Sequence, residues 1–169
     1  MSKSPSCPCG SGVSYARCCR PLHRGEREAE SAEQLMRSRY AAFAEKQAEY
    51  LWETLHPGHE DRAIGHDSAV AAIKETAAEH RYVGLTVLDT APPDEAGLAR
   101  VLFHARVFRK GVDRSFVELS EFARADGLVA GAVGTEATSG WRYLRGEAVP
   151  AREIAAIPGL TIASFRSRG

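Results

Sequence analysis

The chain has 169 residues, 44% of them hydrophobic, which is ordinary for a globular protein with a real core. Its 22 basic and 22 acidic residues cancel, so no global charge bias favours nucleic acid. No run approaches the roughly 18 apolar residues that cross a bilayer. The polar start at residues 1–6 is followed by no apolar signal-peptide core. The composition therefore excludes a membrane-spanning protein and predicts a protein of the cytoplasm.

All cysteines of the chain lie within thirteen positions near its start, at Cys7, Cys9, Cys18 and Cys19. Four soft ligands within a few turns of backbone match the tetrahedral site that zinc requires. Gly10 and Gly12 tolerate positive φ and so allow a tight reversal between the two pairs. A site with four cysteine ligands is coordinatively closed. The sequence therefore predicts a structural zinc ion with no catalytic role.

Disulfide formation and redox chemistry are the alternatives for this cluster. A cytoplasmic protein normally keeps its thiols reduced. A bridge between the adjacent Cys18 and Cys19 would be strained, and one between Cys7 and Cys9 nearly as much. Zinc binding is the interpretation that we favour, and redox chemistry remains the second.

A charged linker over residues 20–30 leads into a helical segment. Ser31, followed three residues later by Gln34, is a capping-box signature. Apolar side chains then recur at helical spacing and predict a long amphipathic helix over about 32–50. Alternatively, the segment continues through Trp52 as a second short helix.

Beyond a break at residues 56–58, where proline disfavours helical geometry, a second helix is predicted over about 67–80. The apolar pattern then changes from helical spacing to alternation. It predicts antiparallel strands over about 83–88, 101–108, 116–123 and 141–145. Helices followed by a strand meander indicate an α+β domain, with the long helix across one face of a curved sheet.

Two shorter features complete the pattern. Asp126-Gly127 is a hairpin signal after the third strand. Residues 150–169 are expected to form a short helix about Ile154 and Ile157, followed by an extended tail.

The cysteine segment resembles a known motif. Cys7-Pro-Cys9-Gly-Ser-Gly, with Tyr15 and then Cys18-Cys19, resembles the SEC-C zinc motif, best known from the tail of the bacterial preprotein translocase ATPase. The fourth ligand of that motif is usually histidine, and Cys19 occupies its place here. Further segments are similar to the YchJ-like family of uncharacterised bacterial proteins, at residues 35–43, 49–57, 83–86 and 118–122.

The resemblance implies a fold but no activity. The expected middle domain is a cone-shaped nuclear-transport-factor-2-like (NTF2-like, cystatin-like) α+β domain, in which helices pack on a curved antiparallel sheet. Cones of this type often form a homodimer through the outer sheet face. Some relatives carry a second SEC-C motif at the C-terminus, whereas this chain has no cysteine after Cys19. The expected domains are the zinc knuckle at 1–25, the cone at 31–147 and a C-terminal extension at 148–169.

A sheet curled around a helix leaves an internal pocket, and related cones host isomerases and dehydratases. The candidate pocket residues are Glu118, His104, Arg39 and Tyr40. Side chains opposite each other on paired strands lie about 5 Å apart, so His104 and Glu118 are expected to be neighbours. A half-buried glutamate with a raised pKa is the base that proton abstraction needs.

Structural roles for these side chains are the favoured alternative. Glu118 then pairs with a strand neighbour such as Arg106, and His104 makes a local hydrogen bond. At least one of Arg37 and Arg39 is expected to approach the apolar face and to pair internally with Glu118 or Glu121 rather than to hold a ligand.

Two functions follow from the sequence. The first is a protein-binding or adaptor protein that contacts another protein through the zinc knuckle. Basic residues flank the metal site at Lys3, Arg17, Arg20 and Arg24, but Tyr15 is its only aromatic residue, which argues against nucleic acid. The alternative is an enzyme or binding protein for a small molecule that uses the cone pocket.

Overall fold

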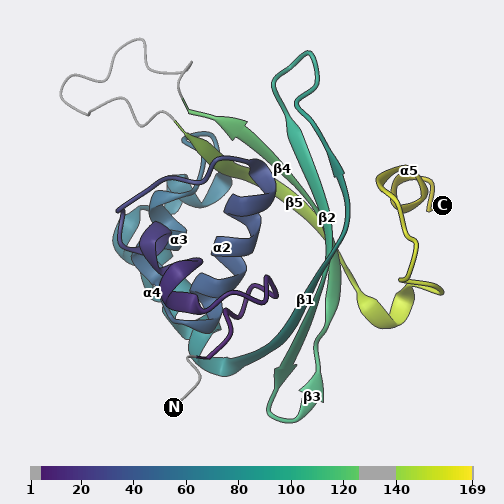
Figure 1. Ribbon diagram of the computed structural model, residues 1–169, viewed down its shortest axis with the longest axis horizontal. Coiled ribbons are helices and arrows are strands. Elements are labelled where there is room, and N and C mark those ends of the chain that lie inside the picture. The colour runs from purple at the N-terminus through teal and green to yellow at the C-terminus, as the bar shows by residue number, and fades with distance from the viewer. Residues whose placement is uncertain (1–4, 126–139, 169) are drawn as a thin grey trace.

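The computed structural model describes residues 5–125 and 140–168, so the hairpin signal at Asp126-Gly127 lies outside the described residues. An antiparallel sheet of order β1-β2-β4-β5, with the short β3 paired to β2, curves around a group of helices (Figure 1). The strands are β1 (His80–Ala91), β2 (Ala99–Arg109), β3 (Val112–Asp113), β4 (Phe116–Arg124) and β5 (Trp141–Pro150). The predicted α+β class and the order of helices before strands are confirmed.

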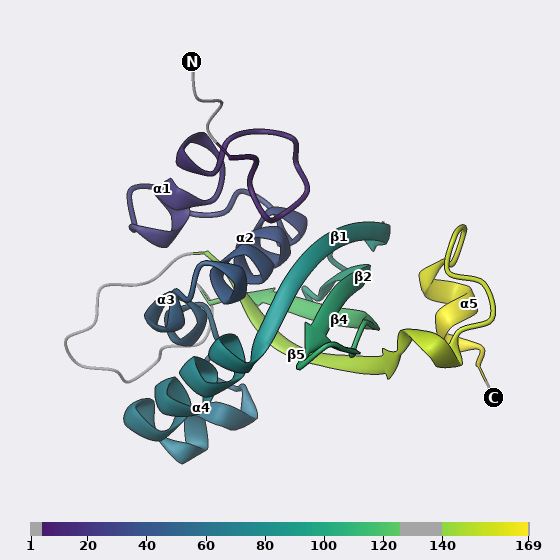
Figure 2. The same cartoon turned by 90° about the horizontal axis from the view of Figure 1, so that it is seen from below.

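The helices lie on both sides of the sheet. Seen from below, α2, α3 and α4 lie on its concave side and α5 lies on the opposite side (Figure 2). The helices are α1 (Arg20–His23), α2 (Ala32–Ala44), α3 (Ala48–Glu53), α4 (His66–Glu79) and α5 (Ile162–Arg166). Short 3₁₀ turns lie at η1 (Tyr15–Arg17), η2 (Glu60–Ile64) and η3 (Ala151–Glu153). No helix in the described ranges is long and apolar enough to span a bilayer.

Helix α2 begins as predicted and ends earlier than predicted. The Ser31 hydroxyl accepts a hydrogen bond from the Gln34 amide at 3.1 Å, as an N-cap does. Lys46 has a φ of 56°, and the amide of Gln47 donates to the carbonyl of Ala42 at 2.8 Å. These features form a Schellman motif, which ends a helix. The continuous helix over 32–50 is therefore wrong, and the alternative of a second short helix is confirmed by α3.

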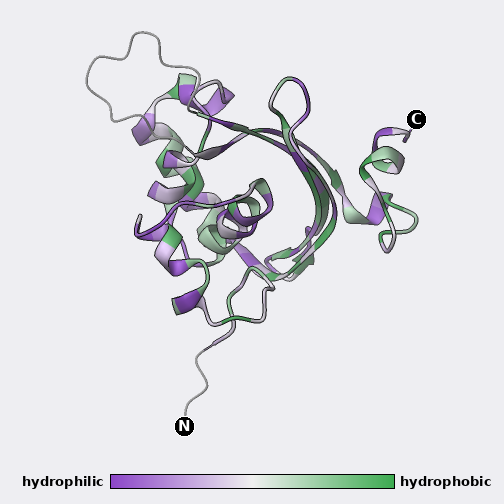
Figure 3. Cartoon of the chain, turned by 45° about the horizontal axis from the view of Figure 1, so that its top comes forward, coloured by the Kyte–Doolittle hydropathy of each residue, from purple (hydrophilic) through white to green (hydrophobic). Residues whose placement is uncertain are grey.

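The main core lies between the helices and the concave face of the sheet. Side chains alternate along β2 and β4, so one set faces the helices and the other set faces away. The set that faces the helices includes the fully buried Phe122 and packs with Leu35 of α2 and Leu51 of α3. Figure 3 shows the strands curling around the helices that this face covers.

The outer face of the sheet carries the C-terminal segment. Leu102, Val117 and Leu119 pack there against Ile162 and Phe165. The expected helix about Ile154 and Ile157 is wrong, because both isoleucines lie outside α5 and pack against this cluster instead. The second apolar face of the strands is thus buried by the chain's own end. A homodimer through this face stays a prediction and would have to form around or displace the segment.

His56, which precedes the proline of the predicted break, gives the fold a pH dependence. Its Nδ1 accepts a hydrogen bond from the amide of Gly58 at 3.0 Å, and its buried Nε2 has no partner among the described residues. Burial lowers the pKa of His56, and the positive charges of Arg62 and Arg142 lower it further. The folded protein therefore holds this imidazole neutral.

A histidine whose pKa is lowered by folding destabilises the folded state in acid, because the unfolded chain binds the proton more readily. We expect the free energy of unfolding to fall as pH drops below about 6.5, by at most about 1.4 kcal/mol per pH unit for one group. Urea titrations of the native protein and of His56→Asn at several pH values measure this effect. Both proteins keep the cysteine cluster, so the difference between their plots of unfolding free energy against pH is due to His56. Equal slopes of these plots would contradict a lowered pKa of His56 in the folded protein.

Candidate metal centre

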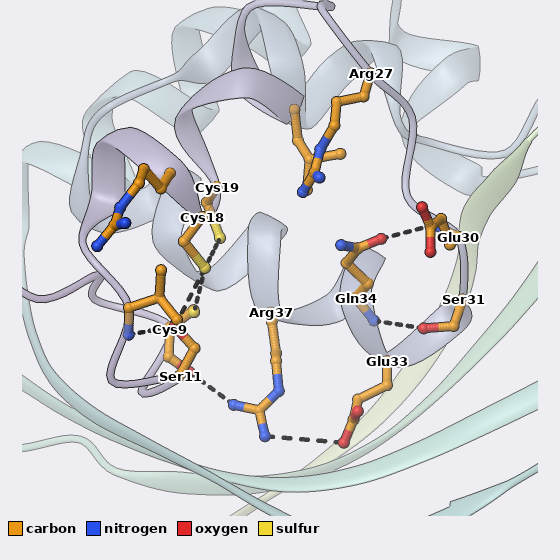
Figure 4. A pocket seen from close by; sticks show the side chains of 13 residues that line it. Cys9, Ser11, Cys18, Cys19, Arg27, Glu30, Ser31, Glu33, Gln34 and Arg37 are labelled. Atoms are coloured by element: carbon orange, nitrogen blue, oxygen red, sulfur yellow. Dashed lines mark hydrogen bonds and ion pairs between the residues drawn. The ribbon is translucent and has the colours of Figure 1, made fainter.

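The four cysteine sulphurs gather at one point, all within 4.8 Å of one another. Figure 4 shows the side chains of three of them, Cys9, Cys18 and Cys19. The Sγ atoms of Cys9 and Cys18 are 3.5 Å apart, and those of Cys18 and Cys19 are 3.8 Å apart. Zn–S bonds of about 2.3 Å in a tetrahedron place the sulphurs about 3.8 Å from each other. All four thiols are free, and no pair is bridged as the disulfide alternative would require. The arrangement suits a tetrahedral metal ion.

Two tight turns bring these sulphurs together. The amide of Cys7 donates to the carbonyl of Val13 at 2.8 Å and closes a small hairpin. Gly10 and Gly12, between them, have φ values of 76° and 78°, which side chains rarely adopt. The positive φ expected at these glycines is confirmed. The η1 turn then returns the chain to the second cysteine pair.

The cluster favours a cation on electrostatic grounds. Hydrogen bonds to the thiols of Cys7 and Cys9, together with burial, raise the pKa of the Cys19 thiol. Four thiolates this close repel one another, so all four lose their protons together only beside a compensating positive charge. A divalent ion supplies that charge and takes the thiolates as ligands.

The nearest histidine is not a ligand. The Nε2 of His23 lies 2.8 Å from the carbonyl oxygen of Ser38, which accepts, so Nε2 carries the proton. Its Nδ1 lies 2.9 Å from the hydroxyl of Tyr15 and therefore accepts. Both ring nitrogens are used, and the only group with metal-site spacing in the described chain is the four cysteines.

The cysteine segment is fixed to helix α2. Arg37 donates from Nη1 to the carbonyl of Cys9 at 2.8 Å. Ala41 packs with the buried cysteines, and Leu22 of α1 belongs to the main core. A Cβ at Gly10 would lie 3.0 Å from the carbonyl oxygen of Leu85 on β1, so the turn also touches the sheet. These contacts anchor the cysteine segment, residues 5–25, to the cone.

A groove of about 560 Å³ lies between the cysteine segment and the N-terminal half of α2 (Figure 4). Figure 4 shows the side chain of Arg27 pointing into this groove. Arg17 also lines it. Acidic side chains contribute one wall, and Glu33 lies 3.8 Å from Nη2 of Arg37. The groove therefore combines an edge of the metal site with arginine side chains.

The predicted pocket exists, but it does not contain all of the predicted residues. A cavity of about 480 Å³ lies inside the cone, and Arg39, Tyr40 and Glu118 line it. His104 does not, because the register pairs Phe103 with Glu118 and His104 with Val117. Neighbouring residues on a strand face opposite sides. The expected proximity of His104 and Glu118 is therefore wrong, and His104 lies on the outer face.

The side-chain pairings that we favoured from the sequence also differ. Glu118 accepts hydrogen bonds from Ser120 at 2.6 Å and Tyr143 at 3.0 Å, rather than from Arg106. Glu121 lies on the outer face, where it pairs with Arg100 at 2.9 Å. Neither carboxylate forms an ion pair with Arg39 among the described residues, so that expectation is wrong.

Arg39 and Tyr40 have structural contacts of their own. Arg39 donates to the carbonyl of Leu51 at 2.8 Å and to the hydroxyl of Thr54 at 2.6 Å. The Tyr40 hydroxyl donates to the carbonyl of Gly84 at 2.8 Å and accepts from its amide at 3.0 Å. Tyr40 therefore anchors β1 to α2, and its oxygen is fully engaged.

Three residues at the cavity's polar end were not predicted from the sequence: His59, Tyr143 and Gly146. Tyr143 and His59 line the cavity, and Gly146 gives Glu118 its room. The aromatic residue in the last strand and the glycine within it were the available signals, since glycine in a strand often marks close approach.

Comparisons with known proteins agree with this architecture. The sequence profile of the YchJ middle NTF2-like domain matches residues 31–146, and that of the SEC-C motif matches residues 6–21. A UPF0225 protein of Geobacter sulfurreducens is 42% identical over 123 residues, which cover 71% of this chain and 72% of that protein.

Two solved structures have a similar fold. The solution structure of a SEC-C motif protein from Rhodopseudomonas palustris has a TM-score of 0.65 at 35% identity, covering 85% of this chain and 98% of that one. The crystal structure of a SEC-C motif protein from Psychrobacter arcticus has a TM-score of 0.67 at 27% identity, covering 82% and 80%. The chain therefore belongs to the YchJ-like family, with a SEC-C motif ahead of its NTF2-like domain.

Proposed function

We propose that the four cysteines hold one structural zinc ion, and that the protein is a binding or adaptor protein whose zinc knuckle contacts another protein. The gathering of four free sulphurs within 4.8 Å is the observation that supports zinc. Four thiolates favour soft or borderline metals over Mg²⁺ or Ca²⁺. A reducing compartment such as the cytoplasm keeps such thiols available for a metal.

The zinc ion in this proposal is structural. Four thiolates fill its tetrahedral shell and leave no position for water or substrate. Three of the sulphur-bearing residues are buried, and Cys18 is partly exposed. The role of the metal is to hold the knuckle rigidly on α2, where its turns form one wall of the groove.

The groove supports a protein partner with an acidic segment. Arg17, Arg27 and Arg37 line it beside Glu30 and Glu33, and residues 1–30 carry five basic and three acidic residues. Guanidinium groups recognise carboxylates through paired hydrogen bonds. An extended acidic peptide lying in the groove would bring its carboxylates to these arginines and its apolar side chains to Val13 and Leu22, which also line it.

Replacing Arg27 with glutamate is expected to weaken peptide binding about tenfold, because charge reversal removes one attraction and adds a repulsion. Fluorescence anisotropy with a labelled peptide of alternating glutamate and leucine measures the affinity. Arg152→Glu is the matched control, since Arg152 is an exposed arginine on η3, outside the groove. The metal content of each variant is measured in parallel.

The acidic peptide should bind more weakly as salt rises. A matched peptide of alternating lysine and leucine should not bind. Equal binding of both peptides, or an unchanged affinity for Arg27→Glu, would contradict the groove as the docking surface. Metal analysis that finds no zinc in the native protein would contradict the metal assignment separately.

A further inference from the structure

The cavity inside the cone has the size and walls of a small-molecule site. Its volume of about 480 Å³ lies within the range of about 300–1,000 Å³ that such sites occupy. Most of its wall is apolar and aromatic, and includes Met36, Phe43, Ile73, Tyr82, Phe103 and Phe116. Arg39, Glu118 and His59 also line it. A site of this kind takes a largely apolar molecule with a polar end.

Arg39 presents unused donors to this cavity. Its Nη1 is engaged by Leu51 and Thr54, and its guanidinium carbon lies 4.7 Å from the ring centroid of Tyr143. Its Nε and Nη2 donate to no residue within 5–125 or 140–168. Burial lowers the pKa of Arg39, as expected for a guanidinium kept from water without a carboxylate in contact. A ligand acceptor would complete its hydrogen bonding.

Glu118 presents an acceptor to the same cavity. Its Oε1 accepts from Ser120 and from Tyr143, and its Oε2 has no hydrogen-bond partner among the described residues. Burial and the nearby Glu118 carboxylate raise the pKa of Tyr143, so its hydroxyl stays a donor to Oε1. These two bonds hold the carboxylate in place and leave the second oxygen for a ligand donor.

Gly146 makes room for this carboxylate. A Cβ at Gly146 would overlap Oε1 of Glu118 and lie 2.6 Å from the Tyr143 hydroxyl. The clash falls on the far ends of side chains and not on the backbone. A residue larger than glycine at position 146 would therefore displace the carboxylate without breaking the sheet. Gly146 is a positioning residue for the site.

His59 supplies a second donor beside Tyr143. The segment after α3 is tied to β5, since the amide of His56 donates to the carbonyl of Tyr143 at 2.8 Å. The His59 ring then lies 5.3 Å from the Tyr143 ring. Its Nδ1 accepts from the amide of Asp61 at 3.0 Å, which leaves the proton on Nε2. Burial lowers the pKa of His59, so the ring is a neutral donor.

We propose that the cavity binds a small, largely apolar carboxamide, whose carbonyl oxygen accepts from Arg39 and His59 and whose N–H group donates to Glu118. Glu60, Asp61 and Arg114 also line the cavity. Arg39 and Glu118, of opposite sign, form no ion pair with each other. A carboxylate would meet the repulsion of Glu118, and an ammonium group that of Arg39. A neutral group that both accepts and donates hydrogen bonds satisfies Arg39 and Glu118 together. This proposal does not depend on the adaptor function of the knuckle.

Three probes of similar size test the proposal: 3-phenylpropanamide, its isostere 3-phenylpropanoate, and 3-phenylpropylammonium. They share an apolar body and differ in the polar end. Titrations followed by NMR on the full-length protein should show saturable binding of the amide, at least about tenfold tighter than either charged probe. Shifts should fall on residues around Arg39 and Tyr143. Tighter binding of the carboxylate, or no saturable binding of the amide at millimolar concentration, would overturn the proposal.

The variant Gly146→Ala is expected to change the binding site without changing the fold. Its affinity for the amide should fall about tenfold or more, while its thermal unfolding temperature stays close to that of the native protein. Gly84→Ala is the matched control, because a Cβ there meets only the side chain of Arg106 at 3.5 Å, an ordinary contact on the outer face. Native amide affinity in Gly146→Ala would overturn the role of Glu118. Arg39→Met should also lose binding.

Discussion

Removal of the metal, by a chelator or by Cys9→Ser, is expected to release residues 5–25 from helix α2 while the sheet stays folded. Metal binding in small zinc knuckles contributes about 10–16 kcal/mol, and so short a segment cannot replace this by burying side chains. Without the metal, the close thiols lose the charge that holds them together. Hydrogen–deuterium exchange should rise across residues 5–25 and stay low in β2 and β4. Elemental analysis should find one zinc ion per native chain.

We expect that the contacts of the segment with the cone, which include the packing of Leu22 and Ala41, do not hold it without the metal. They also include the bond from Arg37 to the carbonyl of Cys9 and the bond from His23 to the carbonyl of Ser38. Such hydrogen bonds contribute about 1 kcal/mol each. Ser11→Ala is the matched control, because the Ser11 hydroxyl is hydrogen-bonded to the sulphur of Cys18 at 3.2 Å but is not one of the four metal ligands. Unchanged exchange in the metal-free protein would show that packing, and not the metal, anchors the segment.

Truncation of the two most buried phenylalanines is expected to have unequal consequences. Phe122 lies in the main core between sheet and helices, and Phe165 lies in the cluster beneath the C-terminal segment. Phe122→Ala should lower the free energy of unfolding of the whole domain by about 3–5 kcal/mol. Phe165→Ala should instead release residues 151–168 locally, with a smaller loss in the main transition. Urea denaturation and hydrogen exchange measure the two effects.

Phe165→Ala also tests whether the C-terminal segment protects the outer face of the sheet from self-association. Release of the C-terminal segment uncovers Leu102, Val117 and Leu119, which form an exposed apolar surface. Phe165→Ala should therefore self-associate as protein concentration rises, which analytical ultracentrifugation detects. If Phe165→Ala lowers global stability as much as Phe122→Ala, the C-terminal segment belongs to the same cooperative unit as the cone.

The features that depend on local spacing along the chain could be predicted from the residues alone. The cysteine cluster is formed by two tight turns within thirteen positions, so residue types and glycine placement were enough to bring the sulphurs together. The order of helices and strands likewise follows from the apolar pattern, which each element shows along its own length. The end of α2 at Ala44 was only an alternative, because the turn that follows needs a positive φ at Lys46, which lysine rarely adopts.

Which side chains share the cavity depends on how the strands pair and how the helices pack on them. The register between β2 and β4 places His104 and Glu118 on opposite faces, and a shift of one residue would have reversed this. The partners of Arg39 come from α3 and its C-terminal end, and Glu118 is held by Tyr143 from a strand distant in sequence. Such contacts depend on how separate elements pack, and the spacing of residues within one element does not predict them.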